Sequence, residues 1–304
     1  MDKRVTELPG IKLGCRTRVL LVGNGINRAY NTCKSSEELI KAALSRGKTD
    51  ISYDLIRYLP FPMQIIAATG NDVKSEMKEI LKEMRNISVP DEQRVFIKKL
   101  LSCGFDAILT TNYSTEIEKA VFGNEWTPRY AYTDQKENPR THFCNYRYTP
   151  LPLDKPASLW HIHGIANNAD TTVIGNYYYG KLLSLVSNYA GRLIGDLKRC
   201  EAKDGIYQPK SWIDYFLLGD VYVMGFKMDY TESDIWWLLD YKSQHSAELF
   251  DAKTVIFEPN LSPDKTVMLK TYRCEVREDP TLDFSSAYRE YYSNVASMHL
   301  CGEV

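Results

Sequence analysis

The chain has 304 residues, of which 44% are hydrophobic and 25% are charged, and its formal net charge is −1. This length and composition fit one large or two ordinary globular domains and exclude wholesale disorder. The balanced charge provides no field that would attract a polyanion, so we expect no direct binding of nucleic acid.

The first residues and the cysteines set further limits. Residues 1–14 hold no apolar segment of a signal peptide, and no window approaches the roughly 18 continuous apolar residues of a membrane-spanning helix. The seven cysteines are scattered, which excludes a zinc ribbon built from closely paired cysteines. We therefore expect a cytoplasmic protein with reduced thiols, no bound metal and no membrane association.

The first third of the chain contains one predicted strand and several predicted helices. Residues 18–22 predict a buried strand that ends at a glycine turn. Ser35 begins a predicted helix with acidic residues in its first turn. Apolar residues at helical spacing over 73–84 and 92–101 predict further amphipathic helices. We expect residues 35–103 to form an inserted small helical subdomain.

The rest of the chain alternates between strands and helices. Residues 123–157 are polar, proline-bearing and aromatic, and predict a long irregular insertion. The alternation predicts an α/β fold with a Rossmann-like, mostly parallel sheet flanked by helices. We expect a single unit over 1–304 whose core comprises 15–34 and 104–304. Strands are predicted at 106–112, 158–163, 171–174, 220–226 and 254–257, and helices at 178–198, 232–241 and 285–297.

Two of the strands end in residues suited to a nucleotide. The first runs into Gly23-Asn24-Gly25-Ile26-Asn27, where missing side chains let backbone N–H groups approach a phosphate. A dinucleotide fingerprint with three glycines fails, because its third glycine position is Arg28, and an ordinary tight turn is the alternative. The second ends in Thr110-Thr111-Asn112-Tyr113, whose asparagine suits ribose hydroxyls or an attacking water, or caps the following helix.

Two later strands end in residues that complete such a site. In His161-Ile162-His163-Gly164 the two histidines would face the same side of the strand. His163 suits a general base, because imidazole titrates near neutral pH, whereas His161 suits a structural role. A metal site with His142 and Cys144 is disfavoured, since the spacing matches no standard zinc pattern. Gly225-Phe226 could admit another part of the same ligand, because ligands bind beyond the carboxyl ends of parallel strands.

In this order, the four segments resemble the SIR2-like family, and within it the bacterial zinc-free branch of NAD-hydrolysing effectors in anti-phage defence. The resemblance covers almost the whole chain. It rests on the glycine turn at 23–27, on Thr110-Thr111-Asn112-Tyr113, on His163-Gly164 and on GFKMDYTESDIWWLL at 225–239.

The resemblance implies an enzyme that binds NAD+ as its substrate without a metal ion. The catalytic residues of the family fall on Asn112 and His163. We add Glu258, at the end of the 254–257 strand, as an acceptor for the adenosine ribose from its position alone. The remaining contacts to NAD+ are expected at Gly23, Asn24, Gly25, Ile26, Asn27, Thr111, Gly225 and Phe226.

The expected function is that of an NAD+ glycohydrolase, which cleaves NAD+ to nicotinamide and ADP-ribose and depletes NAD in abortive infection. We expect control by homo-oligomerisation or by a regulatory partner protein, of which an ATPase is one candidate. A protein deacylase or ADP-ribosyltransferase is an alternative that the missing zinc ligands disfavour. A catalytically silent sensor of NAD or ADP-ribose is another, because Asn27 and Ser114 stand where the family usually has serine and aspartate.

Overall fold

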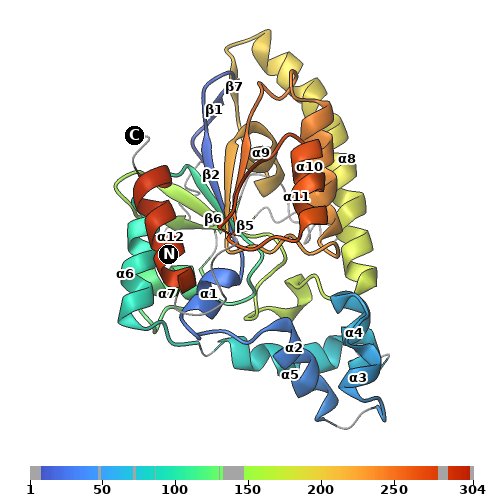
Figure 1. Cartoon of the computed structure of the whole chain (residues 1–304). Coiled ribbons are helices and arrows are strands. Elements are labelled where there is room, and N and C mark those ends of the chain that lie inside the picture. The colour runs from blue at the N-terminus through green and yellow to red at the C-terminus, as the bar shows by residue number, and fades with distance from the viewer. Residues whose placement is uncertain are drawn as a thin grey trace.

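The computed structural model describes residues 8–46, 49–70, 73–85, 87–129, 131–132, 147–279 and 287–301. A mostly parallel sheet runs through the centre with helices on both faces, which confirms the predicted α/β class with a Rossmann-like sheet (Figure 1). The order across the sheet is β10 (Glu275–Arg277), β9 (Thr254–Phe257), β8 (Asp220–Met224), β2 (Arg18–Val22), β3 (Ala107–Thr110), β6 (Ala157–His161), β5 (Arg147–Leu151) and β4 (Ala131–Tyr132). At this last edge β5 runs antiparallel to β6, and the two-residue β4 runs antiparallel to β5.

The parallel strands have the order of a doubly wound dinucleotide-binding sheet. The chain runs outward from the centre through β2, β3 and β6, then returns to β8 and continues through β9 to β10. The direction of winding therefore reverses between β2 and β8. In such sheets the ligand binds at the carboxyl ends of the strands beside this reversal. A separate antiparallel pair joins β1 (Ile11–Lys12) and β7 (Ile206–Tyr207).

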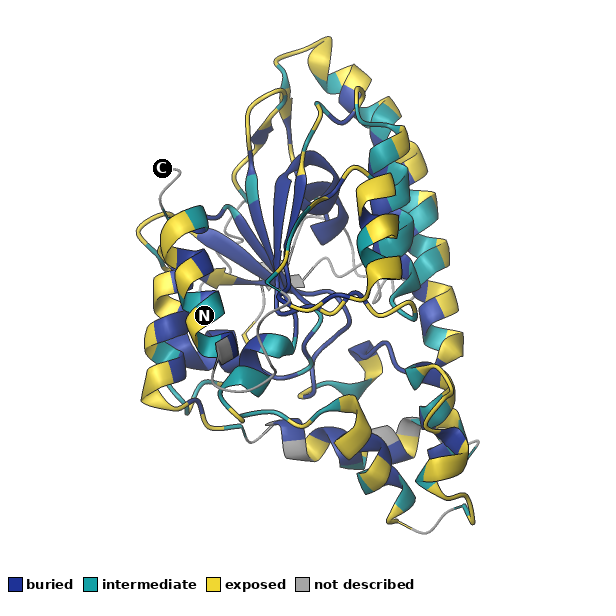
Figure 2. Ribbon diagram, in the orientation of Figure 1, coloured by how far each residue is buried: buried dark blue, intermediate teal, exposed yellow. Residues whose placement is uncertain are grey.

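Successive side chains of the parallel strands enter two cores, one on each face of the sheet. Val19 and Leu21 of β2 pack into the first core, and Leu20 and Val22 pack into the second. All four are at most 3% exposed, and β3, β6, β8 and β9 are buried along their length (Figure 2). The first core lies under α8 (Asn176–Glu201), α9 (Trp212–Leu218), α10 (Ser233–Gln244) and α11 (Pro263–Thr271), and the second under α6 (Asp91–Leu101), α7 (Glu116–Phe122) and α12 (Ala287–Val295).

A third apolar cluster belongs to a helical subdomain beyond the carboxyl ends of the strands (Figure 1). Ser35 starts its first helix as predicted, because its hydroxyl accepts from the Glu38 amide while the Glu38 carboxylate accepts from the Ser35 amide. The predicted end at residue 103 differs from the structure, since Phe96 and Ile97 of α6 pack against the sheet. The subdomain comprises α2 (Ser36–Leu44), α3 (Tyr53–Ile56), α4 (Phe61–Thr69) and α5 (Val73–Arg85).

Two predictions about strands are wrong. Residues 171–174 are not a strand, because Thr171 ends a 3-10 helix (Ala169–Thr171) and its hydroxyl donates to the Asn168 carbonyl oxygen. Such local side-chain bonds compete with strand pairing. Nor is 123–157 irregular throughout, since β5 pairs antiparallel with β6. Residues 130 and 133–146, with His142 and Cys144, lie outside the described residues, as do 285 and 286 of the predicted last helix.

A disulfide joins two segments of the chain that pack in the second core. Cys103, just after α6, is bonded to Cys301, which follows the π-helix Ala296–Leu300. The Arg18 guanidinium strengthens this junction by donating to the Cys103 and Leu300 carbonyl oxygens, each at 2.6 Å. The expectation of reduced thiols therefore fails for this pair. Within the part of the chain that the structure describes, the free cysteines are Cys15, Cys33, Cys200 and Cys274. Among the described residues, no helix is both long enough and apolar enough to cross a bilayer.

Candidate functional site

A cleft opens at the carboxyl ends of the central strands, between the sheet and the helical subdomain. Its cavity volume is about 240 Å³. The subdomain contributes Ser35, Leu39, Phe61 and Met84 to its wall. The opposite wall consists of the segments that follow β2, β3, β6 and β8, which are the segments predicted to carry chemistry. The predicted site residues that line the cleft are Asn24, Gly25, Thr111, Asn112, His163, Gly225 and Phe226.

Two glycine turns touch at the floor of this cleft. The Gly25 N–H donates to the Gly225 carbonyl oxygen at 2.7 Å, and the Gly23 N–H donates to the Met224 carbonyl oxygen at 3.0 Å. A Cβ on Gly25 would lie 2.8 Å from the Gly225 Cα, and Gly225 has a φ of +67°. Glycine is needed for this approach and this backbone conformation. The turn after β2, which leads into α1 (Gly25–Ala29), is thus locked to the turn after β8.

The other predicted contact residues lie behind this wall. Gly23 is bonded to β8, and Ile26 is 2% exposed within the second core. Asn27 is 1% exposed, and its side-chain oxygen accepts from the Gln93 amide at 2.8 Å. Asn27 therefore fixes the turn from behind in this structure rather than facing a ligand.

Glu258 is likewise screened from the cleft. Its carboxylate is 1% exposed and accepts from the Tyr292 hydroxyl at 3.4 Å. The same hydroxyl lies beside the turn, 2.9 Å from where a Cβ on Gly25 would be. Burial raises the pKa of Glu258 to about 7. Glu258 does not line the cleft, so its assignment as a ribose acceptor gains no support.

Asn112 stands in the loop after β3 with its side chain held in place. Its amide nitrogen donates to Glu116 Oε1 at 2.6 Å, and its backbone N–H donates to Thr110 Oγ1 at 3.1 Å. Ser114 donates to Glu116 Oε2 at 2.6 Å. Within the described residues, no donor bonds the Asn112 side-chain oxygen, so this oxygen remains to accept from a ligand or a water.

His161 and His163 do not face the same side, because β6 ends at His161 and the chain then turns. His161 Nδ1 lies 2.8 Å from the Asn112 carbonyl oxygen, and Nε2 lies 2.9 Å from Glu118 Oε1. Both partners are acceptors, so both ring nitrogens carry protons. Burial alone would lower the pKa of His161, but the charge and the hydrogen bond of Glu118 raise it. His161 thus holds the loop that carries Asn112.

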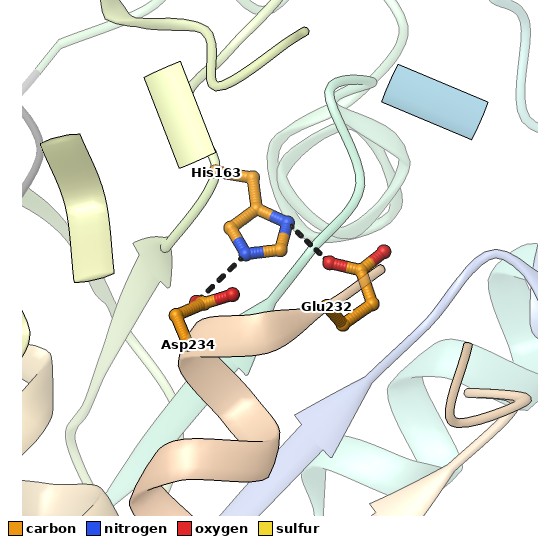
Figure 3. Close-up of side chains that lie close together, drawn as sticks. All are labelled: His163, Glu232 and Asp234. Carbon is orange, nitrogen blue, oxygen red and sulfur yellow. Dashed lines mark hydrogen bonds and ion pairs between the residues drawn. The ribbon is translucent and has the colours of Figure 1, made fainter. Parts of the chain in front are cut away.

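His163 lies between two carboxylates from the start of α10 (Figure 3). Its Nε2 lies 3.0 Å from Asp234 Oδ2, and its Nδ1 lies 3.4 Å from Glu232 Oε2. Burial alone would lower the pKa of His163, but the charges of Asp234 and Glu232 raise it to about 9. Each ring nitrogen faces a carboxylate oxygen, which favours the imidazolium form and leaves no free nitrogen that could accept a proton.

Glu232 is the member of this cluster that is most open to the cleft. Its side chain is 17% exposed, against 1% for His163 and 0% for Asp234, and it lines the cavity. The Tyr179 hydroxyl donates to Glu232 Oε2 at 3.1 Å. Burial raises the pKa of Glu232 to about 7, although the His163 charge opposes this shift. The cleft therefore contains a carboxylate whose pKa is raised from its ordinary value by burial.

The same three residues bring possible metal ligands together, since one atom from each lies within 4.8 Å of the others. The two carboxylates, however, approach opposite nitrogens of the imidazole ring, and these nitrogens point away from each other (Figure 3). Their contacts are those of a carboxylate–imidazolium–carboxylate set. The absence of a metal ion from this chain stays a prediction.

Three cations also line the cleft: Arg28, Lys34 and Lys227. Their charge favours an anionic ligand such as a pyrophosphate near the glycine turns. Sequence reasoning missed these cations and also missed Glu232 and Asp234. Acidic residues are common at the start of a helix, so the sequence does not distinguish Glu232 and Asp234. Only their contact with His163, which lies 71 residues before Asp234, identifies them as part of the site.

No protein-family model matches the chain, and a comparison with curated proteins finds no match. The resemblance to the SIR2-like family therefore rests on the four segments and their arrangement.

Proposed function

We propose that the chain is an NAD+ glycohydrolase, which cleaves NAD+ to nicotinamide and ADP-ribose. The observation that carries this proposal is the convergence of four segments at one cleft beside the reversal of the sheet. Two interlocked glycine turns, the held amide of Asn112 and the cluster around His163 line the same cavity. A nucleotide that spans the reversal would meet all of them.

The chemistry of NAD+ cleavage fits so small a set of residues. Nicotinamide is a cationic pyridinium in NAD+ and leaves as a neutral molecule, so the reaction needs no general acid. The ribose passes through an oxocarbenium-like state, as in glycoside hydrolysis. The protein must hold the substrate, exclude bulk water and provide an acceptor for the proton of the attacking water.

Each task has a candidate in the cleft. Arg28, Lys34 and Lys227 supply positive charge for the pyrophosphate. The side-chain oxygen of Asn112 accepts a hydrogen bond from a ribose hydroxyl or from the attacking water, and Glu116 fixes its orientation. The cluster around His163 supplies the proton acceptor.

The proposal is tested by incubating the purified chain with NAD+ alone and measuring free nicotinamide and ADP-ribose by chromatography. Asn112→Ala should lower kcat by about 100-fold or more, because a misplaced water or ribose costs that much. Calorimetry should show that the variant still binds NAD+. Asn188→Ala is the matched control, because Asn188 is exposed on α8 and donates only to the Ser184 carbonyl oxygen. Equal activity of wild type and Asn112→Ala would contradict the assignment of Asn112.

A non-hydrolysing sensor of NAD or ADP-ribose is the second candidate. One observation favours it: the Asn112 amide nitrogen and both nitrogens of His163 are already engaged by carboxylates. A wild-type chain that binds NAD+ in calorimetry but releases no nicotinamide would support the sensor and would contradict the hydrolase.

A further inference from the structure

We propose that Glu232 is the catalytic residue that accepts the proton of the attacking water, and that His163 is a positioning residue beside it. The inference rests on the proposed function and assigns its proton acceptor. It stands on the geometry of the cluster, in which Glu232 lines the cleft while His163 is held between Glu232 and Asp234.

The neighbouring groups are less suited to take this proton. His163 is 1% exposed, and each of its ring nitrogens faces a carboxylate oxygen. Asp234 is 0% exposed and lies behind the imidazole ring. Glu116 is 1% exposed, and its two oxygens accept from Asn112 and Ser114. Among the described carboxylates near Asn112 and His163, Glu232 alone combines contact with the cleft and contact with the imidazolium.

The surroundings of Glu232 also tune it for this role. Its Oε2 accepts from the Tyr179 hydroxyl and faces His163 Nδ1, so the carboxylate is oriented from two sides. Its pKa of about 7 allows it to gain and lose a proton near neutral pH, where general bases are most effective. The titratable groups that act on it are His163, Tyr113, Tyr179, Asp229 and Asp234.

The step balances as a hydrolysis. The bond between C1′ of the ribose and the nicotinamide nitrogen breaks, and its electron pair leaves with nicotinamide. The oxygen of a water forms the new bond to C1′ while one of its protons moves to a carboxylate oxygen of Glu232. Glu232 then releases this proton to solvent, and ADP-ribose leaves with its new hydroxyl. The charge of His163 stays unchanged throughout.

The first test compares Glu232→Gln with wild type. Glutamine preserves the size of the side chain and an oxygen that accepts from Tyr179, so NAD+ binding should be retained. The kcat for nicotinamide release should fall by about 10²–10⁴-fold, the usual contribution of a general base. The fall of wild-type kcat below about pH 7 should be absent from the residual activity of the variant. Glu248→Gln, an exposed carboxylate beyond α10, is the matched control and should leave kcat and its pH profile unchanged.

The second test uses sodium azide as a nucleophile that needs no base. Azide is an anion, so its attack on C1′ transfers no proton. Glu232→Ala should recover nicotinamide release in azide and form the azido adduct of ADP-ribose, which mass spectrometry detects. Asn112→Ala should not recover, because its defect lies in positioning. Loss of a merely structural contact at Glu232 would likewise not be rescued by azide.

The outcomes separate the two proposals. If wild type hydrolyses NAD+ and Glu232→Gln retains kcat within threefold, the role of Glu232 is overturned while the hydrolase stands. The same holds if Glu232→Ala folds and binds NAD+ but azide fails to rescue it. If wild type binds NAD+ without releasing nicotinamide, both the hydrolase and the role of Glu232 are overturned.

Discussion

At the scale of single residues, the charge on His163 controls the acidity of the carboxylate beside it. The imidazolium lowers the pKa of Glu232, whereas burial and Asp234 raise it. His163→Gln removes this positive charge, so the pKa of Glu232 should rise. The base must be deprotonated to act, and activity at pH 7 should therefore fall by up to about tenfold for each unit by which that pKa rises. Activity should recover at higher pH, and the pH profile of kcat measures this shift.

The pH profile also distinguishes His163 as a positioning residue from His163 as the base. If the imidazole itself accepted the proton, His163→Gln would remove the base, so kcat would not recover at higher pH. A flat loss without recovery above pH 8 would therefore contradict the indirect role. Thermal unfolding of the variant at each pH provides the control for altered stability.

At the scale of elements, the two interlocked turns determine the shape of the cleft floor. A Cβ on Gly225 would lie 2.8 Å from the Ile26 amide nitrogen, and the residue has a φ of +67°. Gly225→Ala should destabilise the chain by about 1–3 kcal/mol, the usual range for such backbone strain. It should also weaken NAD+ binding, because the hydrogen bond between Gly25 and Gly225 joins the turns. Denaturant unfolding and calorimetry measure the two effects.

Gly191→Ala is the matched control for Gly225→Ala. Gly191 lies within α8, and a Cβ there would meet no atom within 4 Å. Gly191→Ala should leave NAD+ binding unchanged and stabilise the chain by about 0.5–1 kcal/mol, because alanine is the better helix former. Equal effects of the two alanine substitutions would show that the floor of the cleft tolerates separation of the turns.

Local sequence signals sufficed for the strand ends but not for the contacts between distant elements. The aliphatic run of β2 predicts a strand that is buried on both faces. Gly23 and Gly25 predict the turn after it, where two backbone segments come close together. Both signals come from residues that are adjacent in the sequence. Asn112 and His163 both line the cleft for a related reason, since parallel strands end at one edge of a sheet. The prediction of a strand at 171–174 is wrong for an equally local reason, because the Thr171 hydroxyl donates to the Asn168 carbonyl oxygen.

The remaining features depend on tertiary contacts that no short pattern contains. The amphipathic repeat of α6 predicts a helix with one apolar face, but the same repeat would pack on the subdomain or on the sheet. Glu232 and Asp234 begin a helix, and their second role appears only where α10 meets the turn after β6. In the same way, the hydrogen bond from Tyr292 to Glu258 joins α12 to the end of β9, and no short pattern predicts it.

At the scale of the whole molecule, the disulfide between Cys103 and Cys301 links positions 198 residues apart. Closing so long a loop restricts the unfolded chain, so reduction should lower the free energy of unfolding by at most about 5 kcal/mol. The bonds from Arg18 to Cys103 and Leu300 should keep the C-terminal segment docked after reduction. Denaturant unfolding with and without dithiothreitol measures the effect. Cys200→Ser is the control, and a thiol assay that finds seven free cysteines in oxidised protein would contradict the disulfide.

The helical subdomain and the sheet should open separately, because each has its own apolar cluster. Ile40, Ile65 and Leu81 are fully buried within the subdomain, which shares the cleft wall with the sheet through Leu39, Phe61 and Met84. A smaller cluster is stabilised by less buried apolar area, so amides of α2–α5 should exchange faster than those of β2 and β8.

Hydrogen exchange with bound ligand tests whether this subdomain covers the site. Asn112→Ala should be used with NAD+, so that the substrate persists during labelling. At a ligand concentration of 100 Kd, binding should stabilise the closed form by about 2.7 kcal/mol and slow exchange in α2–α5 about 100-fold. The exposed end of α8 near Arg199 should be unaffected and serves as the internal control. Unchanged exchange in α2–α5, with slowing confined to the turns after β2 and β8, would mean that NAD+ binds on the sheet without engaging the subdomain.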